Sequence, residues 1–163
     1  MNRNIFIIIM LFFFSLLFAG CDAGPKIAPF DQDSVILAFG DSLTRGTGAA
    51  KEQSYPAALG HMLGHNIINL GIPGEVTSRG LERLPTVLDE YNPSLVLLCH
   101  GGNEFLRRHN QDETIRNLRS MIGLIREKGA DVILIGVPKL GFGLGVPKFY
   151  AAIAEDNQIP YVG

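Results

Sequence analysis

Cysteine is scarce in this sequence, with only Cys21 and Cys99 among 163 residues. The two have no metal-ligand spacing, which excludes a cysteine-ligated metal centre. Cys99 lies in the apolar run "SLVLLCH", where a free cysteine usually behaves as a small buried hydrophobe. We therefore predict no metal site, and no disulfide if Cys21 is modified.

An excess of positive charge is also missing. The chain has 14 Lys and Arg against 16 Asp and Glu, a net charge of -2, and no basic patch. This balance argues against nucleic-acid binding. The glycine-rich stretch "LGFGLGVPK" lacks the spacing and the Lys-Ser/Thr end of a phosphate-binding loop. We expect no nucleic-acid partner and no cofactor.

No apolar run reaches the roughly 18–20 residues that span a bilayer comfortably. The N-terminal run 5–17 is shorter, follows Arg3 and is itself followed by small residues. This order is typical of a secretory signal peptide, which we predict over residues 1–20. The remainder is long enough for one domain with its own core.

The end of this segment, "LFAGC", resembles the lipobox of bacterial lipoproteins, in which the cysteine is diacylated. The resemblance implies lipidation at Cys21, and the alternative is an ordinary signal peptide with an incidental cysteine. Residues 21–33 carry prolines and charges and are predicted to be a lipidated tether, with the domain over 34–163. We expect a protein anchored in a membrane of the bacterial cell envelope, facing the periplasm.

Short apolar runs alternate with helical patterns after the tether. The predicted strands are near-continuously apolar, as in parallel sheets covered on both faces. They cover residues 35–39, 66–70, 94–99, 131–136 and a segment beginning near 160.

Four helices are predicted between these strands, and one of them contains an interior proline. Pro85 is expected to break or restart its helix. The repeated strand–helix–strand order indicates an α/β fold, a doubly wound three-layer sandwich with right-handed crossovers. The predicted helices cover residues 54–64, 77–91, 112–128 and 147–157.

Three motifs follow the first three strands, at the edge of the sheet where α/β proteins carry their sites. They are "GDSL" with Ser42, "NLGIPGE" with Gly71, and "HGGNEF" with Asn103. Acyl transfer needs such a set, because a hydroxyl attacks the carbonyl and preorganised donors stabilise the resulting oxyanion. The predicted donors are the N–H groups of Ser42 and Gly71 and the carboxamide of Asn103. Asp41 is predicted to fix the turn, and the alternative for Ser42 is a simple turn residue.

The three ordered blocks "FGDSLTRG", "NLG" and "GGNE" resemble those of the SGNH hydrolases, also called the GDSL esterase/lipase family. Residues 35–136 are most similar to the periplasmic branch with thioesterase I/lysophospholipase and arylesterases. The resemblance implies a flavodoxin-like α/β/α sandwich and hydrolysis of carboxylic esters or thioesters through an acyl-Ser42 intermediate.

Two features depart from this family. Glu104 stands where members usually have Asp, and the late Asp-x-x-His block that holds the general base is missing. The four histidines are His61, His65, His100 and His109, and none has Asp three residues before it. His100, at the end of the third strand, is a candidate for the wall of the site and is not assigned as the base, whereas His61 and His65 are expected on a solvated helix end.

We expect the chain to be C-terminally truncated, without the last helix of the family fold. As this chain alone, it is expected to have little or no activity, because a serine needs an adjacent base. The alternative is a non-catalytic, lipid-anchored protein that binds a ligand in the same cleft.

Overall fold

A computed structural model of the chain describes residues 24–139 and 145–163. The predicted signal peptide and the lipidation site Cys21 lie outside the described residues and stay predictions. Within the described ranges, no helix has both the length and the apolar character needed to cross a membrane.

A parallel sheet of five strands forms the centre of the molecule, in the order β2-β1-β3-β4-β5. All five predicted strands are confirmed, with bounds that differ from the prediction by a residue or two. The strands are β1 (Ile36–Gly40), β2 (Ile67–Gly71), β3 (Leu95–Cys99), β4 (Asp131–Ile135) and β5 (Tyr161–Val162).

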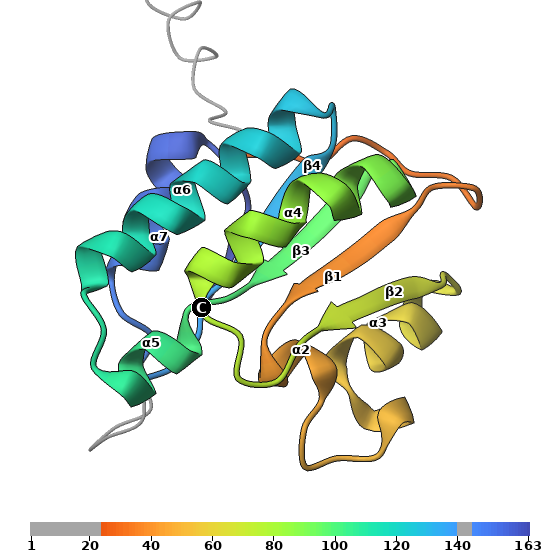
Figure 1. Ribbon diagram of the computed structural model, residues 1–163. Coiled ribbons are helices and arrows are strands. Elements are labelled where there is room, and N and C mark those ends of the chain that lie inside the picture. The colour runs from red at the N-terminus through yellow and green to blue at the C-terminus, as the bar shows by residue number, and fades with distance from the viewer. Residues whose placement is uncertain (1–23, 140–144) are drawn as a thin grey trace, which may run out of the picture.

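Helices cover both faces of the sheet, which confirms the predicted α/β sandwich. One face carries three of the predicted helices, and α4 and α6 lie side by side across the strands (Figure 1). The other face carries α3 (Tyr55–Leu63). The three helices on the first face are α4 (Thr77–Tyr91), α6 (Gln111–Glu127) and α7 (Phe149–Asn157).

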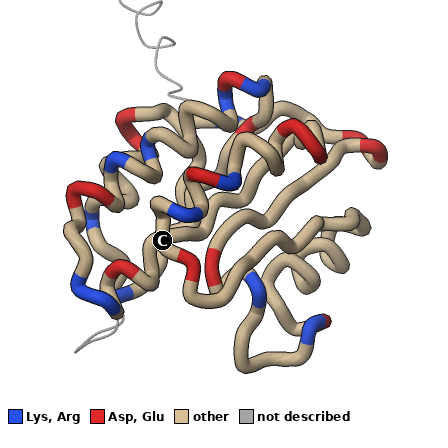
Figure 2. Tube along the Cα trace, in the orientation of Figure 1, with Lys and Arg blue, Asp and Glu red and all other residues tan. Residues whose placement is uncertain are grey.

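The core follows the alternation of side chains along the strands. Leu37 and Phe39 point toward α4, α6 and α7, whereas Ile36 and Ala38 belong to a second cluster on the α3 face. β1 and β3 are buried at every position and carry no charge. Charged residues lie instead mainly on helices and loops (Figure 2).

The predicted break at Pro85 is wrong, because α4 runs without interruption from Thr77 to Tyr91. Pro85 is exposed, so its ring points to solvent. Leu84 and Leu88 are buried in the core on either side of it. Burial of these leucines offsets the missing backbone hydrogen bond of the proline.

The described part of the predicted tether packs on the domain. Ile27 and Phe30 contact the cluster on the α3 face, and the N–H of Ala28 donates to Oδ2 of Asp131 at 2.6 Å. Residues 27–30 therefore extend the second core rather than forming a free spacer.

Candidate active site

The three strand-end motifs converge at one edge of the sheet. Gly40 at the end of β1 pairs with Gly71 of β2 and with Cys99 of β3, so the three chains leave the sheet at the same level. Two short helices begin directly beyond this level, α2 (Ser42–Arg45) and α5 (Gly102–Arg107). They were not predicted, and they carry Ser42 and Asn103.

Asp41 fixes the turn into α2, as predicted. Its carboxylate is almost fully buried and accepts a hydrogen bond from the N–H of Leu43 at 3.0 Å, as the N-cap of α2. Burial raises the pKa of the Asp41 carboxyl, and the hydrogen bond from Leu43 opposes this effect. The cap holds Ser42 at the first position of the helix, where backbone N–H groups have no helical partner.

Ser42 and Asn103 line the same cavity, here called the Ser42 pocket, which has a volume of about 210 Å³. Apolar side chains form most of its wall. A larger hollow beside the edge strand β2 is lined by neither Ser42 nor Asn103. The residues lining the Ser42 pocket are Asp41, Ser42, Leu43, Gly102, Asn103, Phe105, Leu106, Val137 and Pro138.

Gly71 was predicted to offer its N–H to the oxyanion, and the structure contradicts this prediction. Its N–H donates to Oδ1 of Asn69 at 3.0 Å, and Gly71 is not among the residues that line the Ser42 pocket. The glycine packs against α2 instead, since a Cβ there would lie 2.2 Å from the backbone nitrogen of Arg45. Its lack of a side chain therefore serves the close approach of β2 and α2.

Gly74, in the loop between β2 and α4, was missed by the sequence analysis. Its φ is 78°, and no acceptor for its N–H exists among the described residues. The loop contacts α5 at this glycine and at the residue after it: Arg107 Nη2 donates to the carbonyl of Gly74, and Asn103 Nδ2 donates to that of Glu75, each at 2.9 Å. The second glycine of the motif "NLGIPGE" is the sequence feature that could have indicated Gly74 as a donor.

His100 was a candidate for the wall of the site, and the structure contradicts this placement. Its side chain is fully buried, and both ring nitrogens have partners. Nδ1 accepts from the N–H of Gly101 at 3.1 Å, and Nε2 lies 3.2 Å from Oε2 of Glu75.

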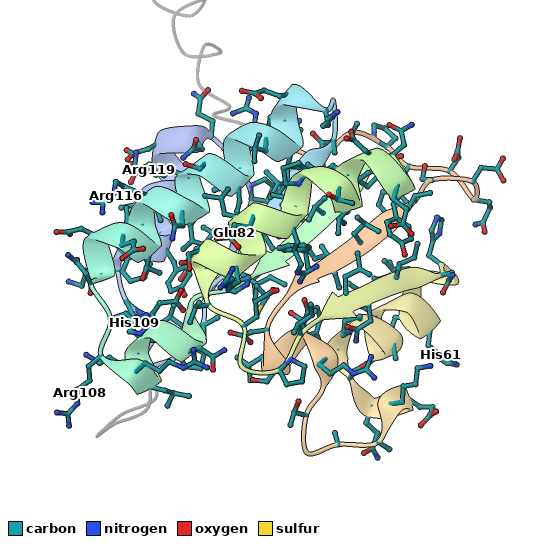
Figure 3. All side chains as sticks on the ribbon, viewed as in Figure 1. His61, Glu82, Arg108, His109, Arg116 and Arg119 are labelled. Carbon is teal, nitrogen blue, oxygen red and sulfur yellow. The ribbon has the colours of Figure 1, made fainter. Side chains whose placement is uncertain are left out.

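The remaining histidines lie elsewhere. His61 on α3 and His109 beyond α5 lie at opposite sides of the molecule (Figure 3). The ring of His65 packs edge-on against that of Phe30. In the described part of the chain, no histidine lines the Ser42 pocket, and no cluster of potential ligands could hold a metal ion.

Glu104 connects α5 to α4. Its side chain is buried, and Oε1 accepts a hydrogen bond from the N–H of Thr77, the first residue of α4. A carboxylate at this position satisfies one of the unpaired N–H groups of the helix N-terminus. The replacement of the family's usual Asp therefore keeps a carboxylate next to Asn103.

Curated relatives of this chain are ester hydrolases. The arylesterase of Vibrio mimicus is 35% identical over 134 residues, which cover 76% of this chain and 67% of the relative. Esterase TesA of Pseudomonas aeruginosa is 33% identical over 158 residues, covering 91% and 79%, respectively.

Solved structures and a family model agree with these relatives. AlinE4, an esterase of the SGNH-hydrolase family, superposes with a TM-score of 0.69 at 31% identity, covering 82% of this chain and 77% of that one. The model of the GDSL-like lipase/acylhydrolase family matches residues 38–162. The chain therefore belongs to the GDSL-like lipase/acylhydrolase family and is an ester hydrolase by descent.

Proposed function

We propose that the protein hydrolyses carboxylic esters or thioesters with Ser42 as its nucleophile. The carrying observation is that Ser42 and Asn103, from motifs about sixty residues apart, line one pocket at the carboxyl edge of the sheet. Ser42 Oγ attacks the carbonyl carbon, and its proton passes to the alcohol or thiol that leaves. Water then hydrolyses the acyl-serine, which releases the carboxylic acid and restores the Ser42 hydroxyl.

Three donors are proposed for the oxyanion: the N–H groups of Ser42 and Gly74 and the carboxamide of Asn103. Neither N–H has an acceptor among the described residues, which leaves both available to a ligand. Asn103 Nδ2 uses one hydrogen for the carbonyl of Glu75 and keeps a second one. Gly74 replaces Gly71 in this role, because the Gly71 N–H already donates to Asn69, whereas the Gly74 N–H has no acceptor among the described residues. Neither glycine lines the Ser42 pocket, and the support for Gly74 is its place directly before Glu75, whose carbonyl accepts from Asn103.

The pocket wall supports a substrate with an apolar acyl group. Phe105, Leu106, Val137 and Pro138 face the cavity, and Leu43 and Leu106 remain exposed at its rim. An apolar chain would gain free energy by leaving water for this surface. We propose an ester or thioester with a hydrocarbon acyl chain.

The test compares the protein expressed from its whole gene with Ser42→Ala. A fluorophosphonate probe forms a covalent bond only with an activated serine, so the wild-type protein should be labelled and Ser42→Ala should not. Ser120→Ala, at an exposed serine of α6, is the matched control and should be labelled like the wild type. Equal labelling of the wild type and Ser42→Ala would defeat the proposal.

Ligand binding without catalysis is the second candidate. It is favoured by one observation, that no histidine of the described residues lines the Ser42 pocket. The codons that follow Gly163 discriminate: an in-frame Asp-x-x-His supplies the base, whereas a stop codon followed by unrelated sequence favours binding. With the 163-residue chain alone, we expect slow turnover of p-nitrophenyl esters, at most ~10³–10⁴ above the rate in water.

We also propose that the protein is a lipoprotein of the cell envelope, acylated at Cys21. The support is the order of cation, short apolar run, small residues and cysteine in the sequence. Cells grown with a labelled fatty acid should incorporate the label into the wild-type protein and not into Cys21→Ser. Label in both proteins would contradict lipidation at this residue.

A further inference from the structure

Glu75 has a buried side chain that the proposed chemistry does not use. Its two oxygens face three donors: Arg83 Nε at 2.7 Å from Oε1, and Arg83 Nη2 at 2.8 Å and His100 Nε2 at 3.2 Å from Oε2. We call Arg83, Glu75 and His100 the Glu75 cluster. Its members come from α4, from the loop between β2 and α4, and from the end of β3.

The hydrogen bonds indicate which atoms donate and which accept in the Glu75 cluster. Gly101 N–H donates to His100 Nδ1, so this nitrogen is an acceptor, and Nε2 carries the hydrogen that points at Glu75. Nε2 of His100 therefore acts as a donor to Glu75, whose carboxylate Arg83 neutralises with a bidentate pair.

The space around the Glu75 cluster is tightly filled. The guanidinium of Arg83 lies 3.9 Å from the ring centre of Phe39 and also donates to the carbonyl of Leu70. A Cβ at Gly80 of α4 would lie 2.6 Å from His100 Nε2. Gly80 thus leaves the room that the imidazole occupies, and the three side chains have little freedom to rearrange.

The backbone of Glu75 links this cluster to the candidate site. Its carbonyl accepts from Asn103 Nδ2, and Gly74, whose N–H has no acceptor in residues 24–139 and 145–163, directly precedes it. The orientation of the Asn103 carboxamide therefore depends on where this short loop is held. Neither Arg83 nor His100 lines the Ser42 pocket.

We propose that Glu75 is a positioning residue, whose pairing with Arg83 and His100 holds the loop 72–76 so that Asn103 and Gly74 face the reacting carbonyl. This inference rests on the proposed function for its catalytic consequence. The structural claim, that Glu75 holds the loop 72–76 and orients the Asn103 carboxamide, does not depend on the reaction.

Glu75→Gln is the primary variant. Glutamine presents an NH₂ group where Glu75 presents an oxygen, so one donor of Arg83 or His100 then faces another donor. Glu82→Gln is the matched control, because Glu82 lies exposed on the outer side of α4 (Figure 3) and, within the described part of the chain, pairs only with Arg79. Arg83→Lys is a milder second variant, which keeps the charge and loses the two-pronged contact.

Three readouts are measured on the protein from its whole gene: kcat and KM for a p-nitrophenyl ester, the thermal midpoint, and the NMR signals of the Asn103 side-chain amide. We expect Glu75→Gln to lower kcat about 10–100-fold, in keeping with a small displacement of a catalytic group, with KM nearly unchanged. The Asn103 amide signals should move, and amide exchange should quicken in the loop 72–76. Arg83→Lys should move the Asn103 signals and quicken the loop exchange in the same direction as Glu75→Gln. Glu82→Gln should change neither the Asn103 signals nor the loop exchange.

Unchanged Asn103 signals in folded Glu75→Gln and Arg83→Lys proteins would overturn the inference, as would a wild-type kcat. A kcat loss that appears equally in Glu82→Gln would also overturn it. Failure of the proposed function is distinguishable, because the wild type would then turn over substrate no better than Ser42→Ala. In that case the Asn103 signals and the loop exchange still decide whether Glu75 positions the carboxamide.

Discussion

Gly71 occupies a space that admits no side chain. A Cβ at this position would lie 2.2 Å from the nitrogen of Arg45 and 2.7 Å from the carbonyl oxygen of Asp41, both backbone atoms. Gly71→Ala should therefore lower the free energy of unfolding by about 1–3 kcal/mol, the usual cost of overpacking. Urea unfolding measures this change.

Gly123→Ala on α6 is the control for this prediction. Nothing lies within 4 Å of a Cβ at Gly123, and alanine is the better helix former, so this variant should be more stable by up to about 1 kcal/mol. Equal effects of the two substitutions would show that the space around Gly71 is not restrictive.

The same residues show what local sequence can reveal about the site. Ser42 and Asn103 could be placed, because a side chain just beyond a parallel strand faces the carboxyl edge of the sheet. The donor glycine could not, because the direction of a backbone N–H depends on the turn and on neighbours such as Asn69. His100 was misplaced for a similar reason, since Glu75 and Gly80 receive its ring on the buried side.

At the level of elements, Pro85 in the interior of α4 lowers the stability of this helix. Pro85 removes one hydrogen bond from a helix interior, and its side chain is exposed. Pro85→Ala should therefore raise the free energy of unfolding, by up to about 3 kcal/mol. Thr86→Ala, at the next exposed position, should raise it by less than about 0.7 kcal/mol. A loss of stability in Pro85→Ala would show that the ring makes a favourable contact.

Long elements were predictable and short ones were not. The apolar stripe of α6 repeats over about three turns and identifies the helix without tertiary information. The helices α2 and α5 are too short for a periodic pattern, and they depend on contacts from elsewhere. Asp41 caps α2, and Asn69 Nδ2 donates to the carbonyl of Thr44 at 2.7 Å. These two short helices nonetheless carry Ser42 and Asn103.

At the scale of the whole molecule, the sheet and its layers followed from near-continuous apolar runs and right-handed crossovers. The Glu75 cluster did not follow from any pattern. Its three residues span 75–100 and meet only because α4 crosses back over the sheet. A buried ion pair of this kind contributes to stability only while its carboxylate is charged, so it makes the fold sensitive to acid.

Acid should weaken the wild-type protein through Glu75. Burial would raise the pKa of this carboxyl, but hydrogen bonds from His100 and Arg83 outweigh burial and hold the pKa below its ordinary value of 4.5. A carboxyl whose pKa is lowered by folding adds stability above its unfolded pKa, and this stability is lost as pH falls through the folded pKa.

The difference in unfolding free energy between wild type and Glu75→Gln should therefore stay level from about pH 7 to pH 5 and shrink below about pH 4.5. Asp41, whose pKa is raised by burial, acts in the opposite direction, but it is common to both proteins and cancels in the comparison. Urea unfolding of both proteins across this range measures the difference, and a gap that widens on acidification would mean that Glu75 is not the stabilising anion.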